Sequence, residues 1–221
     1  MVKLQGLHTV NGTAFQEIKK MTENTHKIFV TTGASNHTET VRASYDLYTT
    51  DPKALERFLD VYKLNKNVWE VACGLGHLSE VLKKRDYKVY STDINDYGYK
   101  GQNRTLNFLS NEVLPQANEG LLECDILTNP PYSSSLPFVK QALNIIEDGY
   151  NVVMFLRLQF LEGKTRKAFF ENNPPKYVYV FSDRIKCTNQ NAPHSIGSSA
   201  ICYAWFVWQK GFKGDPIIKW L

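Results

Sequence analysis

The sequence is poor in the features that mark disulfide-rich, zinc-binding, secreted and membrane proteins. Its four cysteines, Cys73, Cys124, Cys187 and Cys202, are scattered without a C-x-x-C pair, so we expect neither a disulfide framework nor a metal site. No apolar run approaches the roughly 20 residues that a membrane-spanning helix needs. The first residues, MVKLQGLHTVNGTAF, lack the charged and then apolar layout of a signal peptide. We therefore expect a soluble cytoplasmic protein.

The sequence also lacks internal repeats, low-complexity tracts and a strong overall charge, but its charge is unevenly placed. The net charge at pH 7 is +4. Residues 151–221 contain ten Lys and Arg and four Asp and Glu, which gives +6 for this part and −2 for residues 1–150. A basic C-terminal third is compatible with a polyanionic partner. A solvated basic surface explains the same charge equally well.

The 221 residues, of which 43% are apolar, suffice for one domain with a full core. Residues 1–45 show little periodicity and are rich in Thr, Asn and Gly, which predicts an extended or partly mobile arm before a single domain at residues 46–221. The stretch DPKALERFLDVY predicts the first helix of that domain. Asp51 is placed to cap this helix, and Pro52 suits its first position.

Strands and helices then alternate along the chain. Strands are predicted through Ala72, up to Asp93, at CDILTN and at NVVMFLRL, and a helix at SLPFVKQALNIIEDG is predicted to stop at Gly149. Such alternation indicates βαβ units and a mostly parallel sheet. The last two strands, KYVYVFS and SAICYAWFVWQKG, have no helix between them, so they should pair antiparallel at one edge.

The stretch EVACGLG places Glu70 near the end of a strand and Gly74 and Gly76 in the turn that follows. Glycines there let a ligand approach the backbone, and the next helix offers free N–H groups. A G-x-G turn alone is equally typical of a tight turn without a ligand. Roughly 20 residues further on, however, Asp93 lies at a strand tip, where an acid can accept hydrogen bonds from a ribose diol.

These residues leave two classes of cofactor open. A dinucleotide-binding Rossmann domain typically has the motif G-x-G-x-x-G, but Ser79 stands at the position of the third glycine. A ligand with a ribose and an adenine but no phosphates, such as S-adenosylmethionine, fits better, and Glu70 is placed for its cationic amino end. A nicotinamide-dependent oxidoreductase is the alternative, which a preference for nicotinamide cofactor would support.

The stretch CDILTNPPY ends an apolar strand with an amide and two prolines. Pro130 and Pro131 exclude both a helix and further sheet pairing, so this strand end requires a rigid backbone. A Pro-Pro turn followed by an exposed aromatic residue is the purely structural interpretation.

Taken in order, EVACGLG, STDIN and DILTNPPY resemble the amino-methyltransferase branch of the class I S-adenosylmethionine-dependent methyltransferases. NPPY is the most specific of these motifs. Further segments, SNHTETVRASYDLYTTDPKAL, LRLQFLEGKTR and YAWFVWQKGFKGDP, are similar to small phage or prophage adenine-specific DNA methyltransferases, so the resemblance covers most of residues 33–218. It implies an α/β Rossmann-like fold with a seven-stranded, mostly parallel sheet, an antiparallel last strand and helices on both faces. It also implies S-adenosylmethionine as cofactor and a bacterial host cell.

The resemblance assigns catalysis to Asn129, Pro130, Pro131 and Tyr132. The Asn129 side-chain oxygen and the Pro130 carbonyl would accept the two N–H bonds of an exocyclic amino group, which orients its lone pair toward the sulfonium methyl. The prolines fix the carbonyl direction, and Tyr132 would stack on a flipped base.

The resemblance also implies a set of residues that contact the cofactor. They are Tyr48, Thr50, Glu70, Ala72, Gly74, Gly76, Asp93, Ile94, Asn107, Phe108 and Asn129. Tyr48 and Thr50 resemble the segment that closes over the methionine end of the cofactor, although Asp51 in the same stretch also suits a helix cap. Asn107 stands where related enzymes usually have an acid that reads the adenine amino group, and an amide oxygen can accept the same bond.

Nucleic-acid contacts are assigned to side chains near the reacting end and in the connection at residues 183–198, which is long for a loop. They are Tyr132, Ser133, Arg157, Arg184, Lys186 and His194. Asn189, Gln190 and Asn191 in the same connection can also contact phosphates and base edges. Arg157 and Arg166 either face the nucleic acid or form ion pairs with Glu162. So small a recognition surface predicts a short target or low specificity.

The acceptor expected from this resemblance is the N6 amino group of adenine in DNA. NPPY enzymes also methylate RNA bases and a glutamine amide in protein. The glutamine enzymes usually carry a helical N-terminal domain, which residues 1–45 do not resemble. A nucleic-acid-binding relative that has lost its cofactor is the non-enzymatic alternative, and the intact motifs argue against it.

Overall fold

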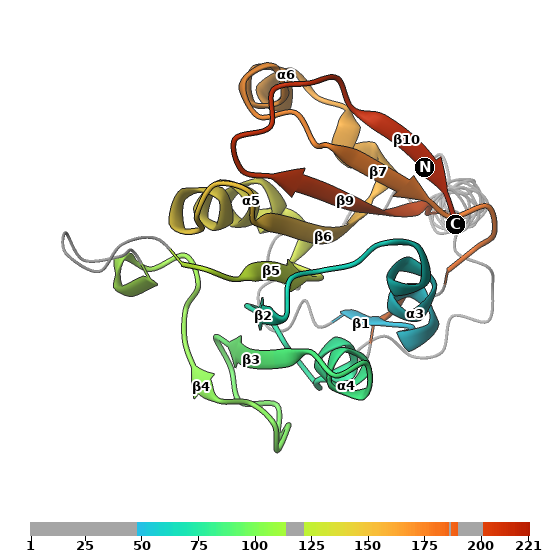
Figure 1. The fold of residues 1–221 in the computed structure, drawn as a ribbon. Coiled ribbons are helices and arrows are strands. Elements are labelled where there is room, and N and C mark those ends of the chain that lie inside the picture. Colours follow the sequence, from blue (N-terminus) through green and yellow to red (C-terminus); the bar gives the residue numbers. More distant parts are fainter. Residues whose placement is uncertain (1–47, 114–121, 186, 190–200) are drawn as a thin grey trace, which may run out of the picture. The chain divides into compact units, whose positions relative to one another are not determined.

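A single twisted sheet organises the part of the chain that the computed structural model describes, which comprises residues 48–113, 122–185, 187–189 and 201–221. The strands of the sheet are β2 (Asn67–Glu70), β3 (Lys88–Asp93), β4 (Arg104–Thr105), β5 (Asp125–Thr128), β6 (Asn151–Arg157), β7 (Tyr177–Val180), β9 (Tyr203–Gln209) and β10 (Ile217–Trp220). Their order is β10-β7-β9-β6-β5-β2-β3-β4 (Figure 1). The predicted arm at residues 1–45 lies outside the described residues.

Only β9 runs antiparallel to its neighbours, β6 and β7, and every other pair in the sheet is parallel. The predicted α/β class with a mostly parallel sheet is therefore confirmed, with eight strands instead of seven. The predicted antiparallel pair forms between β7 and β9. However, β9 lies inside the sheet and β10 occupies the edge. The first six residues of β9 are all buried, whereas the four residues of β10 are all exposed.

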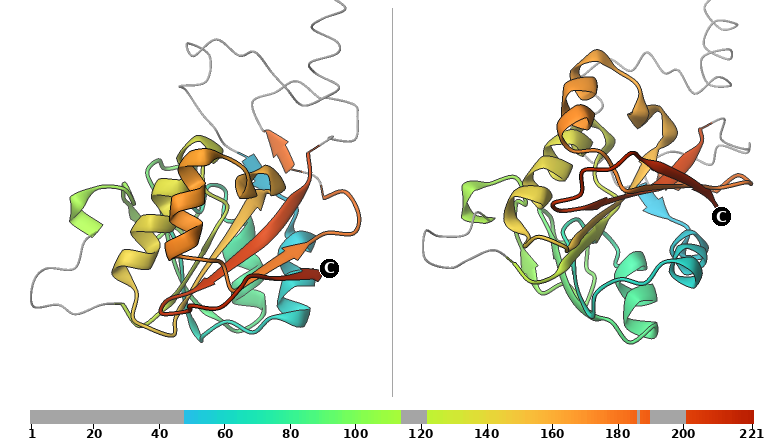
Figure 2. Two further views of the ribbon diagram at one scale, coloured as in Figure 1. Left: turned by 90° about the horizontal axis from the view of Figure 1, so that it is seen from above. Right: turned by 45° about the horizontal axis from the view of Figure 1, so that its top comes forward.

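Helices cover both faces of this sheet. The helices α3 (Pro52–Val61) and α4 (His77–Lys84) lie on one face, and α5 (Ser135–Ile145) and α6 (Lys164–Asn172) lie on the other (Figure 2). Each face has its own hydrophobic core. Because side chains alternate along a strand, Val153 of β6 belongs to the core under α3 and α4, whereas Val152 belongs to the core under α5 and α6.

Two helix ends were predicted from local signals, and one of the two predictions is confirmed. As predicted, Asp51 caps α3, accepting a hydrogen bond from the Lys53 N–H at 3.0 Å. The helix α5 was predicted to stop at Gly149. This prediction is wrong, since α5 ends at Ile145. Ile146 is extended and forms a parallel bridge with Leu122, which the residues of a continuing helix could not do. Among the described residues, no helix is long and apolar enough to cross a membrane.

A separate two-stranded sheet joins two distant parts of the chain. The strand β1 (Tyr48–Thr50) pairs antiparallel with β8 (Cys187–Asn189). The predicted connection at residues 183–198 therefore contains a strand, and residues 186 and 190–198 of it lie outside the described part. This pairing ties that connection to the segment expected to close over the cofactor.

Candidate functional site

The functional residues predicted from the sequence gather because four neighbouring strands are parallel. β3, β2, β5 and β6 lie side by side in that order, so their carboxyl ends meet at one edge of the sheet. Glu70 and Asp93 end β2 and β3, Asn129 directly follows β5, and Arg157 ends β6. This edge is where open α/β sheets bind their ligands.

The glycine turn after β2 needs its glycines for a geometric reason. Gly74 and Gly76 have φ angles of 51° and 80°, which residues with a Cβ rarely adopt. A Cβ on Gly76 would also overlap the ring of Tyr99. The Gly76 N–H donates to the Cys73 carbonyl at 2.7 Å, which closes the turn directly before α4.

Asp93 has a structural role that the sequence did not reveal. Its two carboxylate oxygens accept hydrogen bonds from the Gly74 N–H at 2.9 Å and from the Asn95 N–H at 3.0 Å. Burial raises the pKa of Asp93, and these backbone N–H groups oppose that rise. Each carboxylate oxygen has a second lone pair that can accept a ribose hydroxyl. Ile94, the next residue, is 57% exposed and offers an apolar surface beside it.

Replacing Asp93 by alanine should weaken S-adenosylmethionine binding about tenfold or more, by the scale of a hydrogen bond to a charged group. Isothermal titration with the cofactor measures this loss. Asp96→Ala is the matched control, because Asp96 also accepts a loop N–H, from Gly98 at 2.7 Å, but is exposed. Equal affinity of the Asp93 variant and the wild type would remove Asp93 from the ribose assignment.

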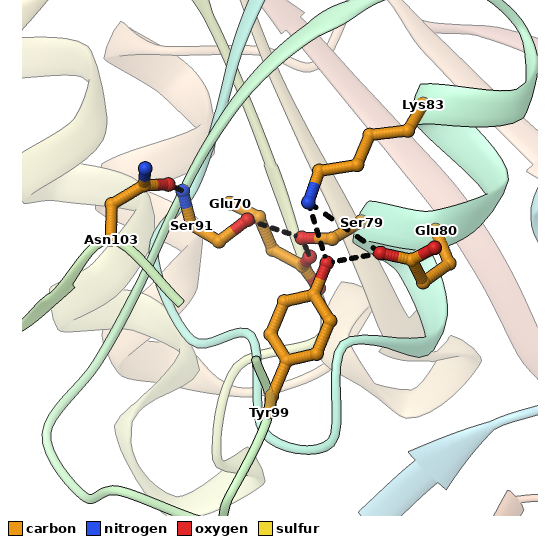
Figure 3. Close-up of polar contacts among 7 residues, drawn as sticks. All are labelled: Glu70, Ser79, Glu80, Lys83, Ser91, Tyr99 and Asn103. Carbon is orange, nitrogen blue, oxygen red and sulfur yellow. Dashed lines mark hydrogen bonds and ion pairs between the residues drawn. The ribbon is translucent and has the colours of Figure 1, made fainter. Parts of the chain in front are cut away.

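Glu70 is buried in a small hydrogen-bonded group (Figure 3). The Ser79 hydroxyl donates to the Glu70 carboxylate and lies 2.6 Å from the Ser91 hydroxyl. Burial raises the pKa of Glu70 to about 8, although the bonds from Ser79 oppose the shift. Ser79, which stands in place of a third glycine, therefore serves to hold Glu70. The predicted contact of Glu70 with the amino end of the cofactor stays a prediction.

Glu70 should make the stability of the protein fall as the pH rises. A raised pKa means that the folded state holds a proton that the unfolded state has lost. The stabilisation is therefore complete below about pH 4.5 and is lost as the pH rises through about 8. Urea unfolding of the wild type and of Glu70→Gln between about pH 5 and about pH 8 tests this, because only the wild type should lose this contribution. Parallel pH profiles would contradict the expectation.

Tyr99 belongs to a second hydrogen-bonded group, beside the glycine turn that follows β2 (Figure 3). Its hydroxyl donates to the Glu80 carboxylate at 2.5 Å and accepts from the Lys83 ammonium at 2.8 Å. Both Glu80 and Lys83 belong to α4, so these bonds hold the loop after β3 against that helix. The sequence did not reveal this role of Tyr99, since the partners of its hydroxyl come from a different element.

The NPPY tetrad follows β5 at the centre of the edge. The Asn129 amide donates through Nδ2 to the Thr50 hydroxyl at 2.9 Å, and Thr50 is buried. Pro130 is buried, and the Pro131 carbonyl accepts the Ser134 N–H at 2.9 Å as the chain turns into the short helix η2 (Tyr132–Ser134). The hydrogen bond to Thr50 sets which side of the Asn129 amide carries its oxygen.

The side chains of the two arginines Arg157 and Arg166 make different contacts. The Arg157 guanidinium lies over the Tyr132 ring, with its Cζ 4.4 Å from the ring centroid. Arg166 folds back onto its own segment, donating to the Gln159 carbonyl at 3.2 Å. Within the described residues, neither forms the anticipated ion pair with Glu162.

The other predicted residues differ in their contacts and in their exposure. Ala72 accepts the Thr128 hydroxyl through its carbonyl at 3.4 Å, and Ser133 is exposed. Asn107 is exposed and accepts the Leu109 N–H at 3.1 Å. Phe108 is 1% exposed and packs within the core.

The remaining substrate candidates belong to the long connection. Arg184 donates to the Cys202 sulfur at 2.8 Å. Lys186, Gln190, Asn191 and His194 lie outside the described residues, as do the side chains of Tyr48 and Asn189. Among the described residues, no group of three or more His, Cys, Asp or Glu could hold a metal ion.

Comparison with known proteins identifies the fold and no nearer relationship. No family model and no curated protein matches the chain. A Vibrio vulnificus protein described as the modification subunit of a candidate type I restriction enzyme is 12% identical with a TM-score of 0.51, and the match covers 96% of this chain and 52% of that protein. This chain therefore spans about half the length of that subunit.

Two further solved structures are similar over most of their length. One is a predicted O-methyltransferase from Agrobacterium tumefaciens, 11% identical with a TM-score of 0.50, where the match covers 72% of this chain and 81% of the other. The second, a candidate hemolysin from Streptococcus thermophilus, is 16% identical with a TM-score of 0.50, and 76% of this chain and 67% of that chain are covered. At such identities the likeness concerns the fold alone, a Rossmann-like α/β fold that methyltransferases also have.

Proposed function

We propose that this chain transfers a methyl group from S-adenosylmethionine to the N6 amino group of adenine in DNA, with the target base flipped out of the helix. The observation that carries the proposal is the place of the NPPY tetrad. Asn129 directly follows β5, whose parallel neighbour β2 leads into the glycine turn. An amide acceptor, a rigid proline carbonyl and a turn suited to a nucleoside thus lie at one edge of the sheet.

The residues at this edge suit a nucleoside cofactor without phosphates. Asp93 is placed for a ribose diol, and the exposed side chain of Ile94 suits an adenine ring. Gly74 and Gly76 give the turn its backbone conformation, and the Tyr99 ring packs against Gly76. S-adenosylmethionine would supply an electrophilic methyl group on a sulfonium.

Asn129 and Pro130 would act by orientation and electrostatics. The lone pair of an exocyclic amino nitrogen is delocalised into the base, so the free amine is a weak nucleophile. Two acceptors, the Asn129 side-chain oxygen and the Pro130 carbonyl, would bind the two N–H groups and turn the lone pair toward the methyl carbon. As positive charge develops on the nitrogen, the same acceptors stabilise it. The bond between the methyl carbon and the sulfur would break as the bond to nitrogen forms, which releases S-adenosylhomocysteine, and the nitrogen would lose one proton to solvent. This mechanism requires no strongly basic side chain.

Three observations favour a nucleic acid as the acceptor. The motif set resembles adenine-specific DNA methyltransferases, the C-terminal third carries a charge of +6, and Arg157 lies beside Tyr132 at the reacting end. The structural similarity to the modification subunit of a candidate type I restriction enzyme, over 96% of this chain, is compatible with DNA as the substrate. RNA and protein are the alternative acceptors for the same chemistry.

The direct test is methyl transfer from radiolabelled S-adenosylmethionine to duplex DNA, single-stranded DNA and RNA in parallel, followed by digestion to nucleosides. The proposal expects N6-methyladenine from DNA. Asn129→Ala protein purified in the same way controls for contaminating enzymes. Label in RNA or protein with DNA untouched would retain the chemistry of the tetrad and overturn the substrate.

A further inference from the structure

The Arg157 side chain occupies a position that the proposed chemistry needs. Its guanidinium covers the ring of Tyr132, the tetrad residue expected to stack on the target base. Arg157 ends β6 and pairs in register with Tyr203, whose ring centroid is 6.0 Å from that of Tyr132. The base-stacking ring therefore already has a planar cation against it.

The charge of Arg157 has no counter-charge within the described residues. The ion pairs found there use Arg57, Lys83, Arg85 and Lys167, and none involves Arg157. Its Nε atom is buried and has no hydrogen-bond partner in the described structure. A buried donor on a cation is costly without an acceptor, so this arrangement suits a group that receives its acceptor from a ligand.

A phosphate is the acceptor that a guanidinium matches best. It binds through two parallel N–H···O bonds, which are stronger than the contact of the same cation with an aromatic ring. A flipped nucleotide brings its flanking phosphates close to the residue that stacks on its base. Removal of the guanidinium from Tyr132 would at the same time expose the ring face for that base.

We infer that Arg157 is a positioning residue that covers Tyr132 in the free protein and exchanges this contact for a backbone phosphate beside the flipped base. This inference rests on the proposed function and names a residue that makes the site select nucleic acid. The guanidinium keeps the Tyr132 ring in its stacking orientation before the substrate arrives. Because the exchange needs a phosphate and a base together, a peptide amide would not drive it.

The test compares Arg157→Gln, which removes the charge, with Arg157→Lys, which keeps it. A fluorescein-labelled DNA duplex is titrated at several NaCl concentrations in the presence of S-adenosylhomocysteine. The glutamine variant should bind DNA about tenfold more weakly, with a log–log salt slope shallower by about 0.9, the value for one lost phosphate contact. The lysine variant should retain the wild-type slope.

Arg85→Gln is the matched control for net charge. Arg85 follows α4 near the start of β3, and thus at the opposite edge of the sheet, where it pairs with Asp60 at 2.7 Å. This variant should leave the slope unchanged. Melting temperatures of all variants show whether they fold.

The outcomes separate the inference from the function on which it rests. If the wild type methylates DNA but Arg157→Gln keeps the wild-type affinity and slope, the inference fails alone. Weaker binding of S-adenosylmethionine by this variant, with an unchanged DNA slope, would assign Arg157 to the cofactor carboxylate and overturn it too. If the wild type instead methylates only protein and binds no nucleic acid, both proposals fail.

Discussion

Replacing Asn129 by alanine should lower turnover at least ~100-fold and leave the affinity for S-adenosylmethionine nearly unchanged, by the scale of losing one oriented group in a transition state. The reason is that the Asn129 side-chain oxygen is assigned to accept a hydrogen bond from the amino group that receives the methyl. This bond would orient the lone pair of the nitrogen. The oxygen can do this only if the Asn129 amide group is itself held in one orientation. The hydrogen bond from Asn129 Nδ2 to the Thr50 hydroxyl at 2.9 Å holds it. Alanine removes the acceptor and this bond together.

Single-turnover methyl transfer and cofactor titration measure the two quantities separately. Asn172→Ala is the matched control, since Asn172 on α6 also donates its amide, to the Ala168 carbonyl at 2.8 Å, but is exposed. This control should keep wild-type turnover. A parallel loss of turnover and of cofactor affinity in Asn129→Ala would show that Asn129 holds the fold of the site instead of the amine.

The second large effect is expected from Asp125, at the opposite end of β5 from the tetrad. Asp125 is fully buried and lies among donors from two other segments. Asn65 donates to it through its backbone N–H at 2.8 Å and its side-chain Nδ2 at 2.7 Å. Asn151 donates through its backbone N–H at 2.9 Å and its side-chain Nδ2 at 3.0 Å. The carboxylate thereby joins the starts of β2, β5 and β6.

Asp125→Ala should lower the free energy of unfolding by about 3 to 5 kcal/mol, because it leaves several buried donors without an acceptor. Urea denaturation measures the change. Asp60→Ala, which breaks an exposed pair with Arg85, should cost at most about 1 kcal/mol. A loss for Asp125→Ala no larger than for Asp60→Ala would mean that Asn65 and Asn151 find other acceptors, most simply water.

The residues at strand ends were predictable because their position follows from chain order. Glu70, Asp93 and Asn129 each come at the end of an apolar run, and parallel strands bring such ends to one edge. The helix α3 was predictable for a similar reason, since Asp51 and Pro52 act on their own neighbours. In each case the signal and its effect lie within a few residues.

Relations across the chain were not predictable in this way. The pattern of β9 showed a strand but not its place between β6 and β7, and the chain beyond it did not reveal that β10 takes the edge. Arg157 had two possible partners by sequence, and the structure places it on Tyr132, 25 positions away. Asp125 was only the first residue of a strand until Asn65 and Asn151 were found around it.

Periodicity, caps and turn residues thus sufficed for the α/β class, the alternation of the central strands and helices and the position of each motif, because they report interactions between chain neighbours. Folding alone decided which polar groups meet: Thr50 with Asn129, Ser79 with Glu70, and the two asparagines with Asp125. The physical reason is range. A hydrogen bond needs its two heavy atoms within about 3 Å. The order of residues along the chain does not specify that distance for partners that are between 9 and 79 positions apart and lie on different elements.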